Sequence, residues 1–208
     1  MKKLALLDLE GTLIDFEFWE EMADVKGDQS LKLLLEKGLR GPGWYESFLD
    51  RVRLILGTPK EVVESVAKRA IGKIRPEAVT LISELKKRQY VTMIVSGGFE
   101  EFVAPVAHAL GVDDYVSQKL IYHNGVIVGV LPVFKEKGEV VDKLRPWFDF
   151  VLAVGDGYND IKMLERADEA VVVGKRAKEI SKKINAKTYN NLGEFVEDLI
   201  KGGDAIKI

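Results

Sequence analysis

The 208-residue chain contains no cysteine and only two histidines, His108 and His123. The lack of cysteine excludes disulfide bonds, thiolate metal sites and a cysteine nucleophile. Two histidines are too few to build a histidine-rich zinc site by themselves. The chain therefore lacks the residues for sulfur-based chemistry and for a histidine-rich metal centre.

The chain also lacks an excess of one charge and a long apolar run. It has 31 basic and 33 acidic residues, for a formal net charge of −2. This balance gives no electrostatic footprint for nucleic acid or for an anionic membrane surface. No apolar run approaches the roughly 20 residues that a bilayer span needs. We therefore expect a soluble, cytoplasmic protein without nucleic-acid or membrane partners. The composition does not indicate whether the protein is a monomer or an oligomer.

Four short apolar runs predict strands that are buried on both faces. They are LALLDL from Leu4, YVTMIVS from Tyr90, FDFVLAVGD from Phe148 and EAVVVG from Glu169. Amphipathic stretches separate them, such as EAVTLISELKKR, whose apolar stripe is expected to hold Val79, Leu81, Ile82 and Leu85. This alternation predicts an α/β fold, a Rossmann-like parallel sheet with helices on both faces.

One segment interrupts the alternation between the first and second core strands. Residues 16–73 contain no convincing buried strand and are typical of helices, with a turn at Gly41-Pro42-Gly43 and a helix start at Thr58-Pro59. We expect this segment to be an inserted helical cap, so that residues 1–15 and 74–208 form the core.

A second segment predicts an antiparallel appendage to the sheet. YVSQKLIYHNGVIVGVLPVF, from Tyr115, alternates apolar and polar residues around Asn124-Gly125. That dipeptide is typical of a β-hairpin with a type I′ turn. The tail GGDAIKI, from Gly202, is expected to be loosely ordered.

Polar residues follow three of the predicted strands where each strand ends. They form the runs Asp8 to Thr12, Ser96 to Gly98 and Gly155 to Asp160, and Lys137 precedes a further amphipathic stretch. Ligands of an open parallel sheet bind beyond the carboxyl ends of its strands. Carboxylates beside a buried sheet cost free energy unless they are paired or metal-bound. The pattern therefore predicts one site at this edge.

The acidic residues of this site suit phosphoryl transfer, which needs an in-line oxygen nucleophile and an acid for the leaving oxygen. Asp8 is the candidate nucleophile and would form an aspartyl-phosphate. Asp8 and Asp156 together are candidates to hold Mg²⁺. Glu10 is the candidate acid, and it would then take a proton from the water that hydrolyses the intermediate.

The remaining residues of the site suit the phosphoryl oxygens. The hydroxyl of Ser96, the backbone N–H groups of Gly97 and Gly98, and the ammonium group of Lys137 would surround them.

The four clusters resemble the motifs of the haloacid dehalogenase superfamily of Mg²⁺-dependent aspartyl phosphatases. Those motifs are DxDx[TV], a strand-end Ser or Thr, a Lys and GDxxxD, and this chain has similar residues in the same order, with Glu10 in place of the second Asp of the first motif. The resemblance implies a magnesium site made of Asp8, Asp156 and the backbone carbonyl of Glu10. It also implies roles for residues around that site, with Asn159 contacting the substrate and with the metal ligands supported by Thr12 and Asp160.

Within that superfamily the chain is similar to the phosphoserine phosphatase branch. The matching patterns are VSGGF at Val95, KGE at Lys137 and GDGYND at Gly155. In that branch a cap Glu receives the amino group of the substrate and a cap Arg its carboxylate. Glu17 and Arg51 stand where those residues fall, which implies phosphoserine as the substrate.

One departure from the family pattern keeps other functions open. Glu10 stands where most members have a second Asp, and a similar branch that transfers phosphate to homoserine has the same DxE pattern. A phosphotransferase, a phosphatase for another small phosphate ester such as phosphoglycolate, and a non-enzymatic phosphate-binding module are therefore the alternatives.

Each candidate residue also has an ordinary structural interpretation. Asp8 could serve simply as the cap of a turn, and Glu10 could be a solvated loop residue. The Ser96 to Gly98 run could be a tight connection in which glycine supplies backbone freedom. Lys135 competes with Lys137 for the lysine role. Charged residues of an amphipathic cap helix usually face solvent, and this is the alternative interpretation of Glu17 and Arg51.

Overall fold

The computed structural model describes residues 1–39 and 43–202. Within these residues the strands form one sheet with the order β4-β3-β2-β1-β5-β6-β7, and only β3 and β4 pair antiparallel. The strands are β1 (Lys3–Leu7), β2 (Tyr90–Phe99), β3 (Asp114–His123), β4 (Val126–Leu131), β5 (Phe150–Gly155), β6 (Glu169–Val173) and β7 (Lys187–Tyr189). This is the predicted α/β, Rossmann-like architecture.

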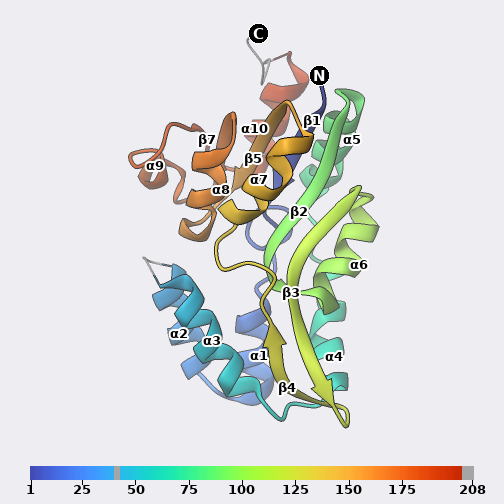
Figure 1. Cartoon of the computed structure of the whole chain (residues 1–208), viewed down its shortest axis with the longest axis vertical. Coiled ribbons are helices and arrows are strands. Elements are labelled where there is room, and N and C mark those ends of the chain that lie inside the picture. Colours follow the sequence, from blue (N-terminus) through green and yellow to red (C-terminus); the bar gives the residue numbers. More distant parts are fainter. Residues whose placement is uncertain (40–42, 203–208) are drawn as a thin grey trace.

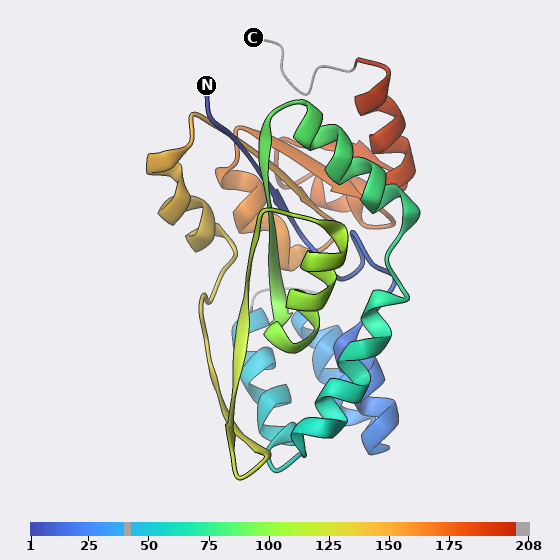
Figure 2. The same cartoon turned by 90° about the vertical axis from the view of Figure 1, so that its right-hand side faces the viewer.

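Helices cover both faces of this sheet (Figures 1 and 2). One face packs against α5 (Pro76–Lys87), α6 (Glu100–Leu110) and α10 (Leu192–Ile200), and the other against α7 (Gly138–Leu144), α8 (Ile161–Arg166) and α9 (Ala177–Ile180). Along β1, Ala5 and Leu7 pack on the face that α5, α6 and α10 cover, whereas Leu4 and Leu6 pack on the face that α7, α8 and α9 cover. Successive side chains of a strand point to opposite faces of the sheet. Because both faces are covered, the strand sequences are continuously apolar.

The chain between β1 and α5 forms helices that lie beyond the carboxyl ends of the strands (Figure 1). They are α1 (Phe18–Lys26), α2 (Ser30–Leu39), α3 (Trp44–Ile55) and α4 (Lys60–Ile71). Aromatic rings join them to the sheet, since the Phe18 ring lies 5.3 Å from the rings of both Phe99 and Phe102. The division of the chain into a core and a cap stays a prediction. The predicted turn at residues 41–43 lies outside the described residues except for Gly43, and the predicted loose tail lies outside them except for Gly202.

The β3–β4 hairpin has the backbone that a type I′ turn requires, with φ values of 48° at Asn124 and 77° at Gly125. Its first strand also belongs to the main sheet. Asp114 pairs parallel with Met93 of β2, and only the later residues of β3 pair antiparallel with β4. The hairpin is therefore an extension of an internal strand.

The tip of this hairpin is hydrogen-bonded to the segment that joins α3 to α4. The N–H of Lys60 donates to the carbonyl of Gly125 at 2.8 Å, and the N–H of Ile127 donates to the carbonyl of Thr58 at 3.0 Å. These bonds attach the inserted helices to the sheet at a second place, far from the aromatic contacts of Phe18.

One expected core residue is wrong. The buried side of α5 consists of Ala78, Leu81, Ile82 and Leu85, and Val79 is 53% exposed. Residues 78, 81, 82 and 85 follow the i, i+3, i+4, i+7 spacing, and a stripe with this spacing leaves position 79 on the outer side. Among the described residues, no helix is long and apolar enough to cross a membrane.

Candidate active site

The predicted site residues lie together at the point in the sheet where the strand order reverses. From β1 the chain order runs one way through β2 and β3 and the other way through β5, β6 and β7. Asp8 follows β1 directly, Ser96 lies near the carboxyl end of β2, and Asp156 follows β5 directly. In this kind of sheet, the switch point is where ligands bind.

A buried lysine joins two of the aspartates. Lys137 immediately precedes α7, and its Nζ contacts Oδ1 of Asp8 and lies 2.6 Å from Oδ1 of Asp160. Thr12 Oγ1 donates to the other carboxylate oxygen of Asp8 at 2.7 Å. None of these four residues is more than 4% exposed. The Asp8 carboxylate is therefore held in one orientation by a cation and a hydroxyl group.

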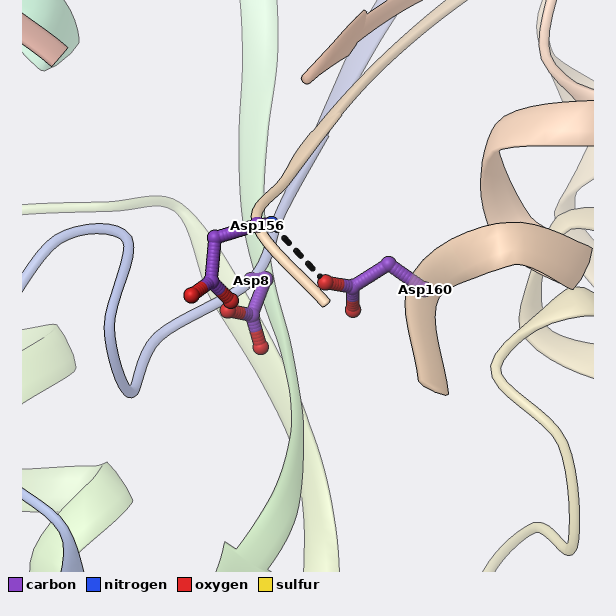
Figure 3. A group of neighbouring side chains, drawn as sticks. All are labelled: Asp8, Asp156 and Asp160. Carbon is purple, nitrogen blue, oxygen red and sulfur yellow. Dashed lines mark hydrogen bonds between the residues drawn. The ribbon is translucent and has the colours of Figure 1, made fainter. Parts of the chain in front are cut away.

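Asp160 also fixes the turn that carries Asp156. Its Oδ2 accepts the backbone N–H groups of Asp156 and Gly157, each at 3.0 Å. Figure 3 shows the first of these bonds and the carboxylates of Asp8 and Asp156 side by side. Both oxygens of Asp160 are thus engaged by the protein itself.

The arrangement fits a divalent cation. Carboxylate oxygens of Asp8, Asp156 and Asp160 lie within 4.8 Å of one another, and oxygen ligands are those that Mg²⁺ prefers. A Cβ on Gly11 would lie 2.6 Å from Oδ2 of Asp156. Glycine is therefore required at position 11, where φ is also +80°, and the Asp156 carboxylate lies directly against the Asp8–Thr12 loop.

The site carries more negative charge than Lys137 neutralises. Burial and the nearby Asp160 carboxylate raise the pKa of Asp8 to about 6. Burial, followed by Asp8 and Asp160, raises the pKa of Asp156 well above its ordinary value. Burial alone would lower the pKa of Lys137, but Asp160 and Asp8 raise it. A bound cation would relieve this repulsion.

The glycines after Ser96 allow close approach of neighbouring groups. Strand β2 continues through them to Phe99, with a register shift after Val95. The N–H of Gly98 donates to Oγ of the buried Ser96 at 3.0 Å. A Cβ on Gly97 would lie 2.5 Å from the Trp44 ring, and a Cβ on Gly98 would lie 2.2 Å from the Phe102 ring and 3.0 Å from Oε2 of Glu10. Only glycine fits at either position.

Glu10 is not a solvated loop residue, which was the alternative interpretation of it. Its Oε1 accepts the N–H of Phe18, the first residue of α1, at 2.8 Å, and burial raises its pKa to about 7. Burial and the neighbouring Glu10 raise the pKa of Glu17 well above its ordinary value. The raised pKa values of both carboxyl groups favour a proton on this pair near neutral pH.

Arg51, on α3, lines a cavity together with Glu10 and Glu17. The residue is 1% exposed, and its guanidinium lies 4.8 Å from the centre of the Trp19 ring. Nε donates to the carbonyl of Ser47 at 3.2 Å, whereas Nη2 is buried without a hydrogen-bond partner among the described residues. Burial lowers the pKa of Arg51 to about 10, so it stays protonated at neutral pH.

Several of these groups line one cavity of about 320 Å³. Asp8, Glu10, Gly97, Asp156 and Asn159 line it on the sheet side, and the helical side contributes residues that include Glu17, Trp44 and Arg51. Lys135 is exposed, with its Nζ 5.6 Å from the Tyr45 ring centre, whereas the Nζ of Lys137 contacts Asp8. The structure therefore brings the lysine of the KGE pattern, and not its rival, to Asp8.

The model of the haloacid dehalogenase-like hydrolase family matches residues 2–168. The chain belongs to this family. The predicted resemblance is thus confirmed, and so is the prediction of a phosphatase of the phosphoserine phosphatase type.

Curated relatives of this hydrolase include two archaeal phosphoserine phosphatases. The protein of Methanocaldococcus jannaschii is 35% identical over 178 residues, which cover 80% of this chain and 82% of the relative. The protein of Archaeoglobus fulgidus is 33% identical over 193 residues, or 88% of this chain. The alignment spans only 55% of the length of the Archaeoglobus protein.

Solved structures extend the similarity to the whole fold. A phosphoserine phosphatase from T. onnurineus in complex with NDSB-201 has a TM-score of 0.83 and 37% identity, over 96% of this chain and 94% of that one. A phospho-aspartyl intermediate analogue of phosphoserine phosphatase has a TM-score of 0.84 and 30% identity, over 94% and 98% of the two chains.

Two groups near the site of this hydrolase were missed by the sequence analysis. Arg176, three residues beyond the end of β6, lines the cavity, and the strand-end rule that identified Asp8 would have found it. Gln118 is fully buried, donates to the carbonyl of Phe134 at 3.0 Å and accepts the N–H of Val133 at 2.8 Å. It holds the segment that leads to Lys137, and no sequence signal distinguishes it from other hairpin residues.

Proposed function

We propose that this phosphatase hydrolyses phosphoserine in the cytoplasm, with Mg²⁺ as its cofactor and Asp8 as its nucleophile. One observation carries the proposal. One cavity is lined by Asp8 and Asp156 at the sheet edge and by Glu17 and the buried Arg51 on the helical side, and the buried Lys137 contacts Asp8. A small molecule with a phosphate at one end and a zwitterion at the other matches this distribution of charge.

Asp8, Asp156 and the backbone carbonyl of Glu10 would hold the Mg²⁺, which supplies positive charge to the oxygens of the transferring phosphoryl group. Asp160 supports them, because its oxygens are already bound to Lys137 and to the backbone. Ser96, the N–H of Gly97, Asn159 and Lys137 would contact the other phosphoryl oxygens.

The first chemical step uses Asp8 and Glu10. A carboxylate oxygen of Asp8 attacks phosphorus, and the bond from phosphorus to the serine oxygen breaks. The protonated carboxyl group of Glu10 donates its proton to that leaving oxygen. The products are free serine and an acyl phosphate on Asp8.

The second step reverses the role of Glu10. Its carboxylate takes a proton from a water molecule while the water oxygen attacks phosphorus, and the bond to Asp8 breaks. Inorganic phosphate leaves, and the Asp8 carboxylate is restored. A pKa of about 7 suits a group that must be acid and base in turn near neutral pH.

The helical side would select the substrate. Nη2 of Arg51 is buried and has no acceptor in the described part of the chain, and a substrate carboxylate would satisfy it. The Glu10–Glu17 pair would receive the amino group. We further propose that residues 16–73 act as a cap that closes over the cavity and excludes water before the first step.

Initial rates on a panel of phosphate esters test this function. The panel contains phosphoserine, phosphoglycolate and an aryl phosphate, each with Mg²⁺ and with EDTA. We expect phosphoserine to give the highest kcat/KM with Mg²⁺ and no turnover with EDTA. A higher kcat/KM for phosphoglycolate would overturn the substrate assignment.

Product analysis in the presence of homoserine separates hydrolysis from transfer. Hydrolysis predicts one equivalent of inorganic phosphate per serine released, with or without homoserine. Formation of phosphohomoserine at the expense of inorganic phosphate would instead establish a phosphotransferase.

A further inference from the structure

A second cavity, of about 390 Å³, lies against the Asp8–Thr12 loop. Its lining includes three cationic side chains, Arg75, Lys175 and Arg176, and a single carboxylate, that of Asp156. Arg75 immediately precedes α5, and the other two cations follow β6. We call this space the basic cavity and define it by these three cations.

The cations of the basic cavity have few protein partners. Within the part of the chain that the structure describes, the side chains of Lys175 and Arg176 make no hydrogen bond or ion pair. Arg75 Nη2 donates to the carbonyl of Gly11 at 3.3 Å and lies 3.7 Å from a carboxylate oxygen of Asp15. Its Nε is buried and has no acceptor in residues 1–39 and 43–202. The cavity therefore has unused donors and a surplus of positive charge.

The basic cavity adjoins the active-site cavity. Gly11, Asp156 and Arg176 line both. The charge of Arg176 acts on Asp156 by direct electrostatic attraction. An anion leaving the active site on this side would therefore meet Arg176 first and then Lys175 and Arg75.

We propose that the basic cavity binds inorganic phosphate, as a second site beside the catalytic one. The choice of phosphate rests on the proposed function, because that reaction releases inorganic phosphate next to Arg176. Guanidinium groups bind phosphate through paired N–H groups, and Nε of Arg75 gains the acceptor that it lacks. Leu192, the first residue of α10, also lines the cavity, and the N-terminus of a helix favours an anion.

Occupation of this site has a kinetic consequence. Phosphate in the basic cavity competes with Asp156 for Arg176, although it does not occupy the place of the substrate. Phosphate therefore inhibits in two ways, competitively from the catalytic site and non-competitively from the basic cavity.

Equilibrium dialysis of the Mg²⁺-loaded full chain against radiolabelled inorganic phosphate tests the site directly. The variant is Lys175→Glu, because Lys175 is exposed and lines the basic cavity but not the active-site cavity. Lys178→Glu is the matched control, since Lys178 is exposed three residues later and lines neither cavity. Both variants change the net charge by the same amount.

The wild type and Lys178→Glu are expected to bind two equivalents of phosphate. Lys175→Glu is expected to keep one, with the second weakened roughly tenfold or more by the reversed charge. Equal binding by the two variants, or a single equivalent in the wild type, would overturn the proposal. The dialysis decides this without turnover, so a failure of the phosphoserine assignment appears only in the substrate panel.

Product inhibition gives a second readout. Without added phosphate, kcat/KM of Lys175→Glu should equal that of the wild type. With added phosphate, Lys175→Glu should show only the competitive component, whereas Lys178→Glu should show both. A purely competitive pattern in the wild type contradicts the second site.

Discussion

The sheet edge and the inserted helices contribute to the cavity in different ways. At the sheet edge, Asp8, Lys137 and Asp160 satisfy one another through hydrogen bonds. On the helices, Arg51 is equally buried, but one of its N–H groups has no partner among the described residues. The sheet edge is thus arranged before a ligand arrives, and the helical side leaves hydrogen-bonding capacity that a ligand would use.

The two regions are also positioned by different forces. Strand β1 pairs in register with both β2 and β5, so backbone hydrogen bonds determine where Asp8 and Asp156 lie. Arg51 depends on ring packing, with Trp19 beneath its guanidinium and Phe48 in contact with Trp19. We therefore expect changes at the sheet edge to affect the chemical step and changes on the helices to affect recognition.

The largest effect is expected from Asp8→Asn. A carboxamide cannot form the acyl phosphate, so kcat should fall by at least about 10⁴-fold on every substrate. Acid-quenched samples incubated with labelled phosphoserine should contain labelled wild-type protein and unlabelled variant protein. The control is Asp24→Asn, which removes the same charge from the exposed Asp24–Lys32 pair. Turnover of an aryl phosphate by Asp8→Asn with Mg²⁺ would contradict the nucleophile assignment.

Lys137→Met should damage both chemistry and folding. It leaves Asp8 and Asp160 buried without their cation, which is expected to destabilise the protein by about 3–5 kcal/mol at neutral pH. It also removes a positive charge from the phosphoryl oxygens, for a loss of about 10²–10³-fold in kcat. Denaturant unfolding and initial rates measure the two effects.

Lys135→Met is the matched control for this variant. Lys135 lies two residues earlier, is exposed and contacts the Tyr45 ring, so its loss should change stability by less than about 0.5 kcal/mol. If Lys135→Met were inactive and Lys137→Met active, the roles of the two lysines would be reversed.

Arg51→Ala should change recognition alone. We expect KM for phosphoserine to rise about 100-fold, because the substrate carboxylate loses a buried charged partner. Hydrolysis of an aryl phosphate, which has no such carboxylate, should be unchanged. Arg53→Ala is the control on the same helix, since the side chain of Arg53 is 67% exposed and pairs with Asp50. Equal losses on both substrates would show that Arg51 only supports Trp19.

The same contrast explains which features were predictable from the sequence. Asp8, Ser96 and Asp156 could be placed together because buried parallel strands bring their carboxyl ends to one edge, whatever the rest of the chain does. Arg51 could be named only through a family resemblance. Its burial depends on ring contacts between segments that are distant in the sequence, and no local pattern encodes them.

Two further features show the limit of local patterns. The short strand β7 depends on pairing with β6, and its three residues carry too little periodicity to be recognised. Gln118 is a polar residue in an alternating strand, so the pattern predicts that it faces solvent. The residue is instead buried, because its side-chain amide is hydrogen-bonded to the backbone of Val133 and Phe134. Tertiary hydrogen bonds of this kind leave no trace in spacing.

The smallest effect is expected from removing Mg²⁺ at different pH values. The pKa of Asp8 rises from 3.8 to about 6 and that of Glu10 from 4.5 to about 7 on folding. Each raised pKa contributes stability below the ordinary value, and this contribution is lost as the pH rises through the folded value. In EDTA the free energy of unfolding should therefore fall between about pH 4 and pH 7.

Mg²⁺ should oppose this fall, because it binds the ionised carboxylates and competes with protons. The stabilisation by Mg²⁺ should thus be about 1–2 kcal/mol larger near pH 7.5 than near pH 5, as measured by thermal unfolding with Mg²⁺ and with EDTA. Asp156→Asn removes a proposed ligand at the sheet edge and should abolish the Mg²⁺ effect at both pH values, whereas Arg51→Ala should leave it intact. An equal Mg²⁺ effect at the two pH values would mean that the cation does not bind at the titrating carboxylates, and the contrast between a sheet edge for chemistry and helices for recognition would lose its electrostatic basis.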